Sequence, residues 1–161
     1  MPQIETSSEW VLAEPIPMEI GFESANYRFD DQVELVGYRV MPASLEVGEV
    51  VQVQLYWRTL QEVESYGKVF VHLIDEQEQL VAQDDGQPVS NSYPIPLWQP
   101  GTIIVDTHAL QLPSDLADGM YTLAVGLYDP KSLQRWTVKE QGGQIVTDGR
   151  AILSMAVEVS P

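Results

Sequence analysis

The sequence contains two histidines, His72 and His108, the side chains best suited to proton transfer or metal binding near neutral pH. Asp106 lies two residues before His108, so their side chains would share one face of a β-strand. If the strand that carries His72 lies alongside, the three residues could bind zinc or a non-haem iron. That set is the sequence's weak candidate for a metal centre.

A structural role is the alternative for the same three residues. His72 lies between Val71 and Leu73, which is typical of a core histidine whose ring is satisfied by a carboxylate or carbonyl group. Asp106 and His108 would then form a solvated or cross-strand pair. A histidine inside a strand, with no ligand motif beside it, seldom binds a metal. We therefore predict no metal at these positions.

Calcium is a second metal to consider, because Asp84, Asp85, Asp115 and Asp118 lie in an interval, residues 69–130, that contains no Lys or Arg. Clustered carboxylates favour hard cations. However, the calcium-loop pattern Asp-x-Asp-x-Asp-Gly is absent. The Asp-Gly pairs are explained by turns, since both residue types tolerate positive φ. The sequence predicts no cofactor.

The sequence contains few of the motifs that are typical of enzymes. A Ser–His–Asp set could be drawn from Ser90 or Ser92 with His108 and Asp106, but no Gly-x-Ser-x-Gly nucleophile elbow is present. Adjacent carboxylates such as Asp84 and Asp85 point to opposite sides of an extended chain, which makes them poor partners for acid–base work on one bond. No phosphate-binding glycine-rich loop is present. The sequence predicts that the protein is not an enzyme.

Aromatic residues are the remaining candidates. Tyr93 and Trp98 lie in the connection Gln87–Gly101, which holds four prolines at positions 88, 94, 96 and 100. Aromatic rings on a stiff loop can stack against the C–H face of a sugar, so Tyr93 and Trp98 are candidate ligand-binding residues. In the alternative, Trp98 folds back and closes the open end of the domain. We favour this plug because a long ordered loop needs an internal anchor.

The composition excludes several function classes. The 161 residues include 24 acidic and 8 basic side chains, for a net charge of −16. This charge repels nucleic acid and anionic membrane surfaces. The absence of cysteine excludes disulfides, thiol chemistry and iron–sulfur clusters. No stretch is long and apolar enough to span a membrane, and residues 1–5 do not resemble a signal peptide. We expect no nucleic-acid partner and no membrane insertion by this segment.

The elements that would position these residues are strands. Period-two alternation runs through several segments, most clearly Val51–Trp57, and no window keeps a helical period over ten residues. We predict an all-β, two-sheet antiparallel sandwich of Ig-like, Greek-key type. Residues 1–15 would form a flexible leader, and residues 16–161 a single domain that begins with an edge strand at Ile16–Phe22. Further strands are expected at Val33–Met41, Lys68–Asp75, Gln79–Gln83, Thr102–Leu112, Met120–Tyr128, Arg135–Val138, Gln144–Thr147 and Ala151–Val159.

The sequence around the later strands carries a family resemblance. Gly119-Met120-Tyr121 looks like a tyrosine corner, with Trp57 as the core tryptophan. The string Phe70-Val-His-Leu-Ile-Asp75, Ala82-Gln-Asp-Asp-Gly86, Trp98-Gln-Pro-Gly101, Val105-Asp-Thr-His108 and Tyr121–Asp129 resembles an Ig-like β-sandwich domain found in bacteria. That domain is often appended to the extracytoplasmic end of membrane glycosyltransferase-like proteins. Gly119-x-Tyr121-Thr122-Leu123 and Gly126-Leu127 are also similar to the sugar-recognising sandwich domains of polysaccharide exporters.

The resemblance implies a sandwich fold, an extracytoplasmic or cell-surface location and no catalytic residues. Three functions follow from the sequence as a whole. The first is a non-catalytic accessory domain that binds neutral carbohydrate. The second is a structural or docking domain for a neighbouring protein domain. The third, well behind, is a metal-dependent enzyme that uses His72, Asp106 and His108.

Overall fold

The computed structural model describes residues 11–12, 22–42 and 44–160. The predicted leader, residues 1–15, lies outside this part of the chain except for Val11 and Leu12, which form a short strand. The predicted edge strand Ile16–Phe22 also lies outside it, apart from Phe22.

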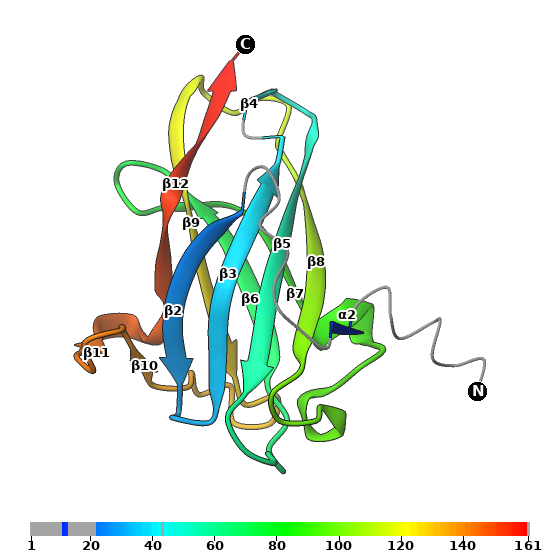
Figure 1. Ribbon diagram of the computed structural model, residues 1–161. Helices are drawn as coiled ribbons and strands as arrows, with labels where there is room; N and C mark the ends of the chain where they lie inside the picture. Colours follow the sequence, from blue (N-terminus) through cyan, green and yellow to red (C-terminus); the bar gives the residue numbers. More distant parts are fainter. Residues whose placement is uncertain (1–10, 13–21, 43, 161) are drawn as a thin grey trace.

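Two β-sheets face each other (Figure 1). The strands are β1 (Val11–Leu12), β2 (Glu23–Phe29), β3 (Val33–Met41), β4 (Ser44–Glu46), β5 (Val50–Thr59), β6 (Lys68–Ile74), β7 (Leu80–Gly86), β8 (Ile103–Gln111), β9 (Gly119–Tyr128), β10 (Val138–Lys139), β11 (Ile145–Val146) and β12 (Ala151–Ser160). Three short turns of helix are α2 (Pro88–Asn91), η1 (Ile95–Leu97) and η2 (Thr147–Gly149).

The front sheet has the strand order β1-β8-β5-β3-β2-β10-β11, and the back sheet has the order β4-β12-β9-β6-β7. The pairings are antiparallel except that β4 runs parallel to β12. The predicted two-sheet sandwich is therefore confirmed. Among the described residues, no helix is long and apolar enough to cross a membrane.

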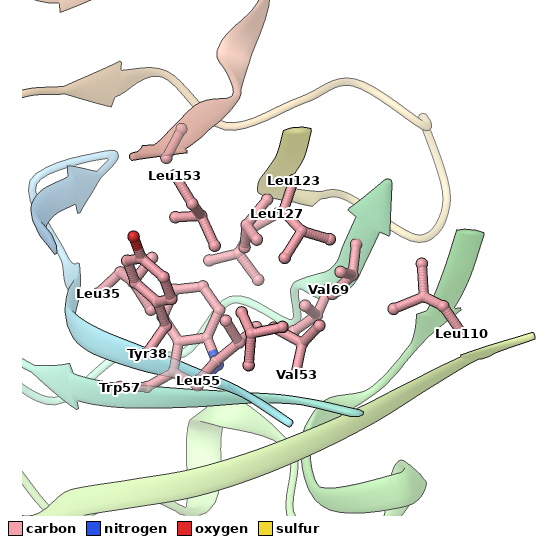
Figure 2. Close-up of a cluster of buried hydrophobic side chains, with 14 of the residues drawn as sticks. Leu35, Tyr38, Val53, Leu55, Trp57, Val69, Leu110, Leu123, Leu127 and Leu153 are labelled. Atoms are coloured by element: carbon pink, nitrogen blue, oxygen red, sulfur yellow. The ribbon is translucent and has the colours of Figure 1, made fainter. Parts of the chain in front are cut away.

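The core lies between the sheets and follows the alternation in the sequence. In β5 the side chains of Val51, Val53, Leu55 and Trp57 are fully buried, because a strand directs every second side chain to the same face. Figure 2 shows Leu55 and Trp57 of the front sheet facing Leu127 and other residues of the back sheet. The apolar positions that were read from the sequence form the interior.

A hydrogen bond of Tyr121 holds the start of β9 in the back sheet. The Tyr121 hydroxyl donates a hydrogen bond of 2.6 Å to the carbonyl oxygen of Ala117, in the turn that precedes β9. This is the bond that a tyrosine corner makes, so that part of the predicted resemblance is confirmed. It fixes the entry of β9, the strand whose other end carries Tyr128.

Candidate functional site

Trp98, the first predicted ligand-binding residue, is buried, with 4% of its side chain exposed. Its indole Nε1 donates to the carbonyl oxygen of Tyr93 over 2.8 Å, and the Tyr93 hydroxyl donates to the carbonyl oxygen of Leu97 over 3.3 Å. Burial raises the pKa of Tyr93. The two aromatic residues therefore hold the connection together, as in the plug interpretation. Tyr93 and Trp98 do not form a pair of exposed stacking platforms.

A groove lies beside this connection. Its volume is about 650 Å³, and we call it the connection groove; it is lined by Glu62, Val63, Glu64, Tyr66, Pro96, Leu97, Trp98, Gln99 and Pro100. Leu97 and Tyr66 are 59% and 52% exposed. The groove therefore presents an apolar and an aromatic side chain to solvent.

The two histidines lie on different sides of the back sheet. In β6, Val69, Val71 and Leu73 face the core, so His72 faces outward and is half-buried, not a core residue as the sequence interpretation had it. His108 is buried inside, with Asp106. Within the described residues, no three His, Cys, Asp or Glu side chains are grouped to hold a metal ion. The structure thus brings together Asp106 and His108 but not His72.

A buried Asp–His–Asp network surrounds His108. Its Nε2 lies 2.7 Å from Oδ2 of Asp106, and its Nδ1 lies 2.7 Å from Oδ2 of Asp84 on β7. Oδ2 of Asp106 also accepts from the indole Nε1 of Trp57 over 3.1 Å, and Oδ1 accepts from the backbone N–H of Val89 over 2.7 Å. Asp106 is fully buried. Asp84 was not expected in this group from the sequence.

The electrostatics of the network favour a charged ring. Burial alone would lower the pKa of His108, but the hydrogen bonds and negative charges of Asp106 and Asp84 outweigh it and raise that pKa above its ordinary value. Both ring nitrogens then donate to carboxylates. No nitrogen is left to accept a proton from Ser90 or Ser92, so the Ser–His–Asp arrangement has no base.

On the outer surface of the back sheet, a hollow of about 320 Å³ surrounds His72; we call it the outer-face hollow, and it is lined by Phe70, His72, Gln83, Asp85, Tyr128, Leu133 and Arg135. The strand register places these side chains together. Asp85 pairs with Phe70, and Gln83 with His72. Arg135 pairs with Tyr128 in an isolated bridge.

Phe70 lies buried beneath the outer-face hollow, with 2% of its side chain exposed. Its ring centroid lies 4.6 Å from that of His72, and the guanidinium carbon of Arg135 lies 4.5 Å above the ring. Such a cation–π contact holds both groups in place. The turn that delivers Arg135 is fixed by Asp129, whose Oδ1 accepts from the N–H groups of Lys131 and Ser132. These same bonds lower the pKa of Asp129.

The polar groups of the hollow provide both donors and acceptors. The Tyr128 hydroxyl donates to Oδ2 of Asp85 over 3.3 Å. Burial, and to a lesser extent the charge of Asp85, raise the pKa of Tyr128. Burial lowers the pKa of His72, with Asp85 opposing and Arg135 and Arg150 adding to this effect. His72 is therefore neutral at pH 7, with one nitrogen that donates and one that accepts.

Gly126 on β9 leaves room for the ring of Phe70, because it lies opposite Phe70 in the register. A Cβ at this position would lie 2.2 Å from Cζ of Phe70 and 2.8 Å from the carbonyl oxygen of Gly149. We expect Gly126→Ala to lower the free energy of unfolding by about 1–3 kcal/mol through overpacking, measured by urea denaturation. Gly142→Ala is the matched control, since nothing lies within 4 Å of its Cβ position. Equal stability of both variants would contradict the prediction.

No protein-family model and no curated protein sequence matches the chain. Among solved structures, the C-terminal domain of wzt is similar over 89% of this chain and 83% of its own length, with 12% identity and a TM-score of 0.56. A CARDB domain from Pyrococcus furiosus, crystallised in complex with di-metal ions, covers 88% of this chain and 97% of its own length, at 12% identity and a TM-score of 0.42. A type II cohesin domain from Acetivibrio cellulolyticus covers 83% of this chain and 96% of its own length, at 8% identity and a TM-score of 0.34. The first likeness shows a shared β-sandwich fold, and the other two are too distant to add to it.

Proposed function

We propose that this chain is a non-catalytic accessory domain of a bacterial extracytoplasmic protein, and that its outer-face hollow binds a neutral carbohydrate. The observation that carries the proposal is a hollow lined by side chains that can exchange hydrogen bonds with sugar hydroxyls: His72, Gln83, Asp85, Tyr128 and Arg135. Phe70, which is 2% exposed, lies beneath Arg135 and His72 and supports them. The extracytoplasmic location rests on the family resemblance described above.

The charges in the hollow select for a neutral ligand. Asp85 and Arg135 are the only formally charged side chains among the lining residues, and they cancel, while His72 is neutral at pH 7. A sugar ring has hydroxyls that both donate and accept, together with an apolar C–H face. The hollow offers acceptors and donors together with the exposed apolar side chain of Leu133 and the ring of Tyr128, which matches that pattern. The net charge of −16 on the whole chain disfavours anionic polysaccharides and nucleic acids.

Binding without hydrolysis follows from the same residues. Glycoside hydrolysis ordinarily needs two carboxyl groups that flank the scissile bond. Asp85 is the single carboxylate among the lining residues of the hollow. The other nearby carboxylate of β7, Asp84, faces inward and is hydrogen-bonded to His108. A ligand in the hollow would therefore be held and not cleaved.

A glycan array followed by NMR titration of neutral hits tests this proposal. We expect affinity near the millimolar range for a single site, equivalent to about 4 kcal/mol. Asp85→Asn should weaken binding about tenfold or more, because a hydrogen bond to a charged group contributes about 1.5–3 kcal/mol. Chemical shift changes should cluster on β6, β7 and the turn at residues 129–135.

Tyr66→Ala in the connection groove is the matched control, since it removes an exposed aromatic ring of a second surface. It should leave the affinity unchanged. Loss of binding in Tyr66→Ala but not in Asp85→Asn would move the site to the connection groove. A folded protein that binds no neutral glycan would overturn the carbohydrate proposal.

Docking of a neighbouring protein domain is the second candidate function. The exposed Leu97 and Tyr66 in the connection groove favour it, because exposed apolar side chains in a groove are typical of protein contacts. The carboxylates of Glu62 and Glu64 would favour a basic partner surface. Leu97→Ser should then weaken the association of this domain with the rest of its natural protein, and Asp85→Asn should not.

A further inference from the structure

The buried Asp–His–Asp network joins the two sheets at one edge. Asp84 lies on β7, the last strand of the back sheet, and His108 lies on β8 of the front sheet. The 2.7 Å contact between them therefore ties an edge strand of one sheet to the other sheet. Asp106 extends this tie, because its Oδ1 accepts from Val89 in the turn α2 that follows β7. One cluster thus holds both the end of β7 and the next turn.

The turn α2 needs such a restraint. Val89, Ser90 and Asn91 have φ values of 55°, 52° and 68°, in the left-handed region. That region is unfavourable for side chains other than glycine and most of all for β-branched ones such as valine. The turn is held from outside by Asp106 and from within by the Asn91 side chain, whose Oδ1 accepts from the N–H of Gln87 over 2.8 Å.

The geometry of the network depends on one proton. Both ring nitrogens of His108 lie within hydrogen-bond distance of carboxylate oxygens, which only accept, so both nitrogens must carry a proton. The charged groups that face the ring are Asp84 from β7 and Asp106 from β8 itself. β5 presents Trp57 and, in the register opposite His108, Val53, neither of which is charged. α2 presents its backbone.

Loss of that proton would break one particular contact. A neutral ring has one nitrogen without hydrogen, and that nitrogen would face a carboxylate. The Asp84 side chain is 41% exposed and can turn to water, whereas Asp106 is fully buried and also accepts from Trp57 and Val89. The contact between His108 and Asp84 is therefore the one that opens.

Asp85, the next residue of β7, lies on the opposite face and contributes to the outer-face hollow, where it accepts from the Tyr128 hydroxyl. We propose that the buried Asp–His–Asp network is a proton-dependent latch that fixes the end of β7, and with it Asp85, and that opens when His108 loses its proton. Its effect on ligand affinity rests on the proposed function, whereas the latch itself does not.

The sign of the pH dependence follows from the network. Because the pKa of His108 is raised in the folded protein, the latch is fully closed below the ordinary histidine value of about 6.5. It is lost as the pH rises through the raised pKa. Opening therefore takes place above pH 6.5, where the raised pKa of His108 lies.

The first experiment follows the His108 ring nitrogens by NMR and the hydrogen-exchange protection factors of the amides at residues 84–87 and 89–92, from pH 5 to pH 10. We expect His108 to titrate above 6.5, and the protection of the amides at residues 84–87 to fall with the same midpoint, whereas the Val89 amide, which donates to Asp106, should keep its protection. Asp84→Asn should fold, since its site is partly exposed, and should lower that midpoint by about one pH unit or more. Asp115→Asn, an exposed change of equal charge, should leave the midpoint unchanged. A His108 midpoint at or below 6.5, or protection of residues 84–87 that is independent of it, would overturn the latch.

The second experiment measures the affinity for the neutral glycan of the wild type and of Asp84→Asn on both sides of the midpoint. The affinity should fall severalfold as the latch opens, at a lower pH in the variant. Constant affinity across a demonstrated opening would overturn the coupling to Asp85. If no glycan binds at all, the proposed function fails, and the NMR and exchange data still decide whether the latch exists.

Discussion

Replacing Trp57 with alanine is expected to lower the free energy of unfolding by about 3–5 kcal/mol, the cost of truncating a large buried aromatic ring. Trp57 is fully buried, and its ring meets that of Phe29 edge to face, with centroids 5.4 Å apart. The change also removes the indole donor from Asp106, which is fully buried. Since a domain ordinarily has a free energy of unfolding of about 5–15 kcal/mol, the variant would lose a large part of its stability.

Urea denaturation followed by far-UV circular dichroism measures this effect without relying on tryptophan fluorescence. Trp57→Phe separates its two causes, since phenylalanine fills part of the cavity but donates no hydrogen bond. Tyr66→Ala, an exposed aromatic truncation, should change the stability by no more than about 0.5 kcal/mol. A loss below about 1.5 kcal/mol in Trp57→Ala would show that this ring is not the centre of the core.

The strands that alternate regularly are the ones that the sequence predicts well. Val33–Met41 coincides with β3, and the alternating residues Val51–Trp57 lie within β5. In such strands the alternation of apolar and polar residues predicts which side chains face the core. Local pattern and final structure therefore agree.

Strand β2, at Glu23–Phe29, escapes prediction for a physical reason. Its register with β3 shifts between Ser24 and Tyr27, and Asn26 has a φ of 62°. A bulge of this kind inserts an extra residue, so the period-two pattern breaks within the strand. The sequence gives no other signal for this element.

The sequence also does not show which face of β6 points to the core. Phe70, Val71 and Leu73 are all buried, so the strand is apolar on both sides and its pattern does not say which side faces the core. His72 was therefore expected inside and lies outside. The outer-face hollow depends on that choice and on Arg135, which is distant in the sequence.

In the buried Asp–His–Asp network, too, the sequence predicts some contacts and not others. That Asp106 and His108 share a face follows from their spacing. Trp57 joins them because the register pairs Leu55 with Asp106, which makes Trp57 a diagonal neighbour on the same face. Asp84 joins only because β7 meets β8 across the two sheets, and no local pattern encodes a contact of that kind.

The second large effect is expected for Asp106→Asn, which should cost about 3–5 kcal/mol, because it removes the fully buried carboxylate that balances the charge of His108 and leaves only the partly exposed Asp84 to do so. Asparagine has the same shape, but its amide nitrogen donates and does not accept. The Asp106 carboxylate accepts from Trp57 and His108 at Oδ2 and from Val89 at Oδ1. Whichever way the amide turns, its NH₂ group faces at least one of these donors.

Asp84→Asn is the matched control, and it should cost no more than about 1 kcal/mol, because that side chain is 41% exposed and water screens its charge.

The two variants should also differ in how their stability depends on pH. In the wild type the raised pKa of His108 makes stability fall as the pH rises above about 6.5. Asp106→Asn removes the main group that raises that pKa, so the fall should shrink or disappear. Urea midpoints at pH 6 and pH 9 measure both effects, and equal losses in the two variants would mean that Asp106 is not the centre of the network.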